Sequence, residues 1–128
     1  MSIQFPPNCG NSPKSKLLIA FNEAFMKGDV PAILEMVEDD IIWNLVGDKV
    51  INGKEAFEKE LKIMAEYPIK SMEIFDVITH GKAAAINGQI AVADGKIYEF
   101  CNVYTFKSAG AKVIKKIKSF IIHQKGYE

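Results

Sequence analysis

The Asp94-Gly95 pair is the feature that most constrains the fold of this 128-residue chain. It joins two long, largely apolar runs, residues 83–93 and 96–106. Asp-Gly between such runs is the strongest short-range signal for a β-hairpin, because a type I′ turn needs a positive φ at both central residues. We therefore expect two long antiparallel strands that turn at Asp94 and Gly95.

A two-residue turn also fixes which side chains share a face of this hairpin. Gln89 then lies opposite Phe100, and Asn87 lies opposite Asn102, because side chains alternate between the two faces of a strand. One face would carry amides and aromatic rings together: Asn87, Gln89, Ala91, Tyr98, Phe100, Asn102, Tyr104 and Phe106. Such a face is typical of a small-molecule cavity. The alternative is a face that packs against another subunit.

Composition and charge limit the class of protein. With 128 residues, of which 48% are hydrophobic, the chain is long enough for one domain with one core. Sixteen basic residues balance sixteen acidic ones, which argues against a nucleic-acid partner bound through phosphate neutralisation. No stretch approaches the roughly 20 apolar residues of a membrane span, and residues 1–11 lack the features of a signal peptide. We therefore expect a cytoplasmic protein without a membrane partner.

The order of the expected elements predicts an α+β fold. Residues 1–11 read as an irregular N-terminal arm, and residues 12–128 as a single domain. A helix is expected to open at Ser12-Pro13 and to end at Gly28. A short helix, a strand over residues 41–46 and a third helix that ends at Pro68 follow. Four antiparallel strands complete the chain, and this segregation of helices from strands is typical of the α+β class.

Several short motifs resemble SnoaL-like proteins of the nuclear-transport-factor-2-like superfamily. They are FNEAFMKGDV at residues 21–30, EDDIIW at 38–43, INGKEAF at 51–57 and NVYTF at 102–106. Their order and spacing extend the resemblance over about residues 14–123. The resemblance implies a cone in which three N-terminal helices are wrapped by a curved, mostly antiparallel sheet around an internal cavity. It also implies a homodimer formed through the sheet.

The resemblance says little about the reaction, because this superfamily includes isomerases, cyclases, epoxide hydrolases, dehydratases and non-catalytic binders. In the pattern of ketosteroid isomerase, Phe21 falls at the tyrosine of the first helix, and Leu45 falls near the general base. Neither side chain can exchange a proton. Asn102 falls at the protonated aspartate, and its amide can still donate a hydrogen bond. Steroid isomerisation is therefore not expected.

Two residues are candidates for catalysis. Asn102 would orient a substrate oxygen, and His123 would move a proton, since histidine can exchange one near neutral pH. The alternative for His123 is a strand-end side chain near solvent. The candidate substrate-binding residues are Phe21, Trp43, Leu45, Asn87, Gln89 and Tyr104. No cofactor and no metal site is expected, because two isolated histidines and two distant cysteines provide no ligand set.

These observations predict a protein that binds a small, largely apolar or carbonyl-bearing molecule in the cone, with lyase, isomerase or hydrolase chemistry as the catalytic version. The alternative is a non-catalytic protein-interaction or dimerisation module of the same fold. The position of Asn102 distinguishes the two. A cavity of roughly a few hundred cubic ångströms around Asn102 would favour the ligand-binding version. A subunit interface there would favour the interaction module.

Overall fold

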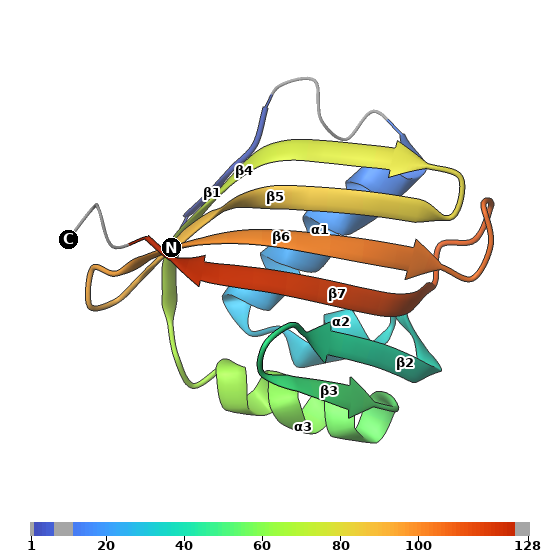
Figure 1. The fold of residues 1–128 in the computed structure, drawn as a ribbon, viewed down its shortest axis with the longest axis horizontal. Coiled ribbons are helices and arrows are strands. Elements are labelled where there is room, and N and C mark those ends of the chain that lie inside the picture. Colours follow the sequence, from blue (N-terminus) through green and yellow to red (C-terminus); the bar gives the residue numbers. More distant parts are fainter. Residues whose placement is uncertain (1, 7–11, 125–128) are drawn as a thin grey trace.

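The computed structural model describes residues 2–6 and 12–124 of the chain. A single sheet dominates it, with α1 lying behind the sheet and α3 beside β3 (Figure 1). The mixed α+β class expected from the order of elements is confirmed. The elements are β1 (Ser2–Gln4), α1 (Pro13–Lys27), α2 (Val30–Leu34), β2 (Val37–Leu45), β3 (Lys49–Asn52), α3 (Lys54–Met64), β4 (Ile69–His80), β5 (Ala83–Val92), β6 (Ile97–Phe106) and β7 (Ile114–His123).

The sheet has seven strands in the order β1-β4-β5-β6-β7-β2-β3. The pairs β1–β4 and β2–β7 are parallel, and the other neighbouring pairs are antiparallel. Strand β4 carries a bulge between Ile74 and Asp76, and bulges bend a strand and increase its twist. Gly88 lies opposite this bulge, where a Cβ atom would come within 2.1 Å of the Glu73 carbonyl oxygen. Only glycine can occupy this position without a shift of the backbone.

The N-terminal segment differs in part from the irregular arm that we expected. Ser2–Gln4 forms β1, which pairs with residues 71–73 of β4. The prediction is therefore wrong for these three residues, because the exposed edge of β4 offers backbone groups that an extended segment can pair with. Residue 1 and residues 7–11 lie outside the described residues.

Helix α1 begins and ends where the sequence predicts. The Ser12 hydroxyl accepts a hydrogen bond from the Ser15 backbone N–H at 3.1 Å, and Gly28 ends the helix with a φ of 71°. Leu18, Phe21 and neighbouring residues of one helix face are buried against the sheet. None of the helices in the described part of the chain is long and apolar enough to span a membrane.

The turn between β5 and β6 differs from the expected type I′ turn. Gly95 has a φ of 92°, whereas no residue other than glycine has a positive φ in the described chain, so Asp94 does not adopt the required conformation. The Gly95 N–H donates to the Val92 carbonyl oxygen, and the Val92 N–H donates to the Lys96 carbonyl oxygen. The loop therefore has three residues, with glycine in the left-handed position of a bulge.

The additional loop residue shifts the hairpin register by one position. Asn87 pairs with Cys101, and Gln89 pairs with Glu99, whereas Ile86 lies opposite Asn102. A shift of one residue moves alternate side chains to the opposite face of the sheet. The prediction that Asn87 and Gln89 share a face with Asn102 is therefore wrong. The observed register is favoured because it places the apolar Ile86 in the core, where it is fully buried.

Candidate functional site

A cavity of about 50 Å³ lies between the helices and the face of the sheet that they cover, which we call the inner face. Asn22, Asn102 and Ser119 are the polar residues of its wall, together with the indole N–H of Trp43. No charged side chain is among the described residues that line it. The complete lining is Phe21, Asn22, Phe25, Trp43, Phe57, Leu61, Met72, Ile90, Phe100, Asn102, Ile117, Ser119 and Ile121.

A buried hydrogen-bond cluster connects helix α1 to strand β6 behind this wall. Nδ2 of Asn22 donates to the Leu18 carbonyl oxygen at 2.8 Å and to the Tyr104 hydroxyl at 3.2 Å. Nδ2 of Asn102 lies 3.3 Å from the same hydroxyl. Burial raises the pKa of Tyr104 from 10.0 to about 12, although its hydrogen bonds with Asn22 and Asn102 lower it. The phenol is therefore protonated at neutral pH.

A second buried hydrogen bond joins β2 to β7 in the same wall. Nε1 of Trp43 donates to the Ser119 hydroxyl oxygen at 2.9 Å. The indole also packs edge-on against Phe57, with ring centroids 5.3 Å apart. Ser119 on β7 is the direct cross-strand partner of Asn102 on β6, and such partners have Cβ atoms about 5 Å apart. The two polar side chains therefore lie next to each other on the cavity wall.

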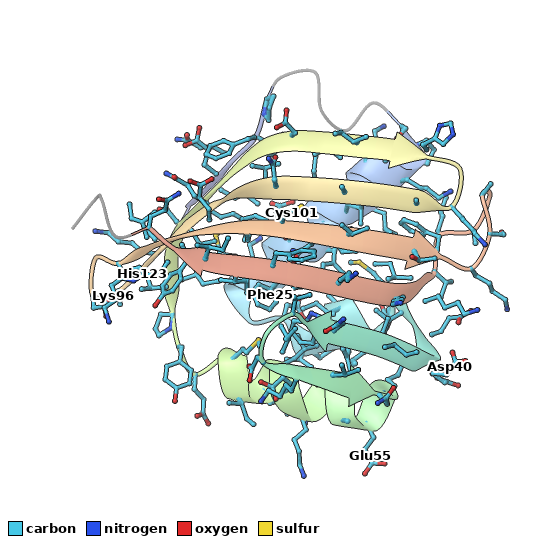
Figure 2. The ribbon with its side chains drawn as sticks, in the orientation of Figure 1. Phe25, Asp40, Glu55, Lys96, Cys101 and His123 are labelled. Atoms are coloured by element: carbon cyan, nitrogen blue, oxygen red, sulfur yellow. The ribbon has the colours of Figure 1, made fainter. Side chains whose placement is uncertain are left out.

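Phe25 borders both this cavity and a second hollow at the ends of α1 and α3. It belongs to the last turn of α1 and is labelled in Figure 2. Phe25 and Leu61 line both spaces, and the second hollow has a volume of about 170 Å³. The inner cavity, at about 50 Å³, is smaller than the few hundred cubic ångströms expected around Asn102. A ligand larger than a few atoms would therefore need a side chain of the wall, such as Phe25, to move.

The residues predicted from the sequence fall into three places. Phe21, Trp43 and Asn102 line the cavity, and Tyr104 lies directly behind it. Leu45 is buried beside Ser119 but is not part of the lining. Asn87 and Gln89 lie on the opposite face of the sheet, as the corrected register requires.

His123 lies at the end of β7, away from Asn102. It pairs with Tyr98 across the strands, and the two rings have centroids 5.1 Å apart. Figure 2 shows it near Lys96, at the end of the sheet that holds the β5–β6 turn. Tyr98 is four residues from Asn102 along β6, about 13 Å at the rise of a β-strand. The structure thus does not bring the two candidate catalytic residues together.

Asn22 and Ser119 are site residues that the sequence reasoning missed. Asn22 follows Phe21 and lies four residues after Leu18, so it is on the apolar stripe of α1, where a polar side chain is unusual. Ser119 alternates with Ile117 and Ile121 on β7, a polar residue within an apolar face. In both cases, a polar residue at a predicted core position was the available signal.

The other face of the sheet, which we call the outer face, is exposed and partly apolar. Cys101, labelled in Figure 2, lies near its centre between Asn87 and Phe120. The large apolar side chains exposed there include Ile78, Val103, Phe120 and Ile122. The charged residues of this face include Glu73 and Asp76 on β4, Glu99 on β6, and Lys116 and Lys118 on β7.

Comparison with protein families gives one match, to the SnoaL-like domain over residues 18–114. The chain belongs to the SnoaL-like family. This agrees with the resemblance of the sequence motifs and with the cone-shaped arrangement of the sheet and helices. The comparison with curated proteins finds no match.

Solved structures share the fold of this SnoaL-like protein. An NTF2-like protein of unknown function from Cytophaga hutchinsonii is 26% identical, with a TM-score of 0.61, over 84% of this chain and 97% of that chain. An NTF2-like protein of unknown function from Burkholderia xenovorans is 15% identical, with a TM-score of 0.73, over 87% and 84%. An LEH-like epoxide hydrolase from M. tuberculosis is 18% identical, with a TM-score of 0.71, over 84% and 81%.

Proposed function

We propose that this SnoaL-like protein binds a small, neutral, largely apolar molecule in the inner cavity. The observation that carries the proposal is the composition of the wall, in which a few polar groups are set among apolar and aromatic side chains. Such walls are typical of small-molecule sites, where the polar groups orient the ligand and the apolar surface supplies affinity. Without a charged partner in the lining, a charged ligand would lose hydration that nothing replaces.

The same wall favours binding over proton-transfer catalysis. A general base must lie within hydrogen-bond reach of the proton that it removes. The lining holds no carboxylate, imidazole or ammonium group among the described residues, and Tyr104 keeps its proton at neutral pH. The epoxide hydrolase from M. tuberculosis therefore supports the fold of this protein more than its reaction. The catalytic role of His123 stays a prediction. The cytoplasmic location of the protein also stays a prediction.

The single tryptophan provides a direct test of ligand binding. Trp43 is the only tryptophan of the chain and forms part of the cavity wall, so its fluorescence reports on the site without a label. We would screen neutral ketones, epoxides and ethers, with carboxylates as a charged comparison, by Trp43 fluorescence and by thermal shift. A ligand at about one hundred times its Kd should stabilise the fold by about 2.7 kcal/mol.

Two substitutions of asparagine by leucine locate the binding site. Asn102→Leu should weaken binding about fivefold to tenfold, because it removes one hydrogen bond worth about 1 kcal/mol. Asn87→Leu is the matched control on the outer face and should leave the affinity unchanged. If Asn87→Leu weakens binding and Asn102→Leu does not, the ligand site is not the inner cavity.

We also propose that two copies of the chain pair through their outer faces. The exposed apolar side chains of this face would be buried, as stable association requires. With a two-fold axis along the strands, β4 of one copy lies over β7 of the other, so the exposed Ile78 and Ile122 of both copies come to lie in the interface. This dimer uses the face opposite to Asn102, whereas the interaction-module alternative placed Asn102 itself in a subunit interface. It is compatible with a ligand in the inner cavity.

The association is tested by the mass of the protein in solution. Ile78→Asp and Ile122→Asp place a charge on exposed positions of the outer face and should convert a dimer into a monomer. Ile63→Asp, on the exposed side of α3, is the control and should leave the mass unchanged. A wild-type protein that stays monomeric at every accessible concentration would contradict the proposed dimer.

A further inference from the structure

The hydrogen bonds behind the cavity have directions that can be worked out from their donors. The Leu18 carbonyl oxygen can only accept, so the amide group of Asn22 that lies 2.8 Å away must be its NH₂ group. The same nitrogen lies 3.2 Å from the Tyr104 hydroxyl and has no lone pair to accept with. The Tyr104 oxygen must therefore accept from Asn22, and its own proton must go elsewhere.

The remaining partner of that proton is the amide of Asn102. The hydroxyl of Tyr104 is fully buried, and its hydrogen-bond partners among the described residues are Asn22 and Asn102. If Asn102 also presented its nitrogen, two NH₂ groups would point at one phenol oxygen, and the phenol proton would have no acceptor, which costs free energy in a buried site. A rotation of the Asn102 amide by about 180° exchanges its nitrogen and oxygen without a change in packing.

The bond between Trp43 and Ser119 is directional for the same reason. An indole N–H can only donate, so the Ser119 oxygen accepts at 2.9 Å, and the serine proton is left to donate. Ser119 and Asn102 are cross-strand partners on the cavity wall. Two series of hydrogen bonds, each with a fixed donor-to-acceptor direction, therefore end side by side on the cavity wall. One runs from Asn22 through Tyr104 to Asn102, and the other runs from Trp43 to Ser119.

We propose that Asn22, Tyr104 and Trp43 are positioning residues, which orient the Asn102 amide and the Ser119 hydroxyl so that both donate hydrogen bonds into the cavity. The cavity then selects ligands with a neutral acceptor oxygen, such as a ketone, epoxide or ether. This inference rests on the proposed function, since it names the ligand class of the same cavity. It assigns Ser119 as a ligand-binding residue beside Asn102. It also gives a role to Asn22, a buried polar residue of α1 in the cavity wall.

The orientation of the Asn102 amide can be measured without a ligand. In an NMR spectrum of the ¹⁵N-labelled protein, the side-chain NH₂ protons of Asn102 should give cross-relaxation peaks to the Ser119 side chain and not to the Tyr104 ring edge. The opposite pattern, with strong peaks to the Tyr104 ring, would overturn the proposed direction of the hydrogen bonds.

The selectivity is tested with two probes of nearly the same shape, cyclopentanone and methylenecyclopentane, which differ by an acceptor oxygen. Binding is followed by the single Trp43 indole resonance, and the readout is the ratio of the two Kd values. Asn22→Asp replaces the donor by a group that accepts from Tyr104 and so reverses the direction of the hydrogen bonds. We expect the ketone preference to fall about fivefold to tenfold in Asn22→Asp, Tyr104→Phe and Ser119→Ala, the effect of one hydrogen bond.

The outcomes separate this inference from the proposed function. Thr105→Val, which removes a hydroxyl from the same strand at an outer-face position, is the control and should keep the wild-type ratio. If both probes bind and the ratio is unchanged in the folded variants, the cavity binds ligands but this inference is wrong. If neither probe binds to the wild type or to Phe25→Ala, in which the wall is opened, the proposed function and this inference both fail.

Discussion

Ionisation of Tyr104 should lower the stability of the protein at alkaline pH, and Tyr104→Phe should abolish that loss. The hydroxyl is buried between helix α1 and the sheet, where its hydrogen-bond partners among the described residues are two amides and no cation. A phenolate at this position would lose its hydration without gaining a positive partner. Burial accordingly raises the pKa of Tyr104 from 10.0 to about 12.

The sign and size of the effect follow from this raised pKa. The folded protein holds the phenol proton more tightly than the unfolded chain, so the stabilisation is complete below about pH 10 and is lost as the pH rises through about 12. One pKa unit corresponds to about 1.36 kcal/mol, so the complete loss approaches about 2.7 kcal/mol. About 1.4 kcal/mol of it should be lost by about pH 11.

The assay is urea-induced unfolding of the wild type and of Tyr104→Phe at a series of pH values from neutral to about pH 11. At neutral pH the variant should be less stable by about 1–3 kcal/mol, because Asn22 and Asn102 lose their partner. The difference between the two proteins should narrow by about 1.4 kcal/mol by about pH 11. Tyr67→Phe, at a side chain that is 70% exposed, is the control. A difference that stays constant with pH would refute the reasoning.

Three further predictions concern packing and the turn. Phe25→Ala should join the inner cavity to the neighbouring hollow, so that ligands too large for the wild type bind, at a stability cost of about 2 kcal/mol measured by urea unfolding. Gly88→Ala should destabilise the fold by about 3 kcal/mol or more, since the new Cβ overlaps the β4 backbone, whereas Gly110→Ala, with no atom within 4 Å of the added Cβ, should be neutral in the same assay. Gly95→Ala should cost about 1 kcal/mol of thermal stability, because alanine disfavours a positive φ; an unchanged Tm would contradict the three-residue loop.

Local signals in the sequence were sufficient to predict most helices and strands and some of the residues that line the cavity. Ser12 and Gly28 define the limits of α1 because helix caps act within a few residues. The resemblance to SnoaL-like proteins indicates Phe21, Trp43 and Asn102 as site residues, hairpin alternation also indicates Asn102, and all three line the cavity. Their roles in binding a ligand stay predictions.

The face occupied by Asn87 and Gln89 could not be obtained from the turn alone. Asp94-Gly95 fits both a two-residue and a three-residue loop, and the two differ by one residue in register. Packing decides between them, because one register buries Ile86 and the other would bury Asn87. The apolar alternation of β5 carried this information, and the turn motif was the weaker guide.

The sequence by itself determined the class of the fold, the order of its helices and longer strands, and the family, because caps, turns and alternation act over short distances along the chain. The tertiary structure decided which polar groups meet. Asn22 and Tyr104 are 82 residues apart, as Trp43 and Ser119 are 76 apart, and nothing in the local pattern of either segment specifies its partner. Their contacts exist because helix α1 and strands β2, β6 and β7 close around one core, where each buried donor must find an acceptor.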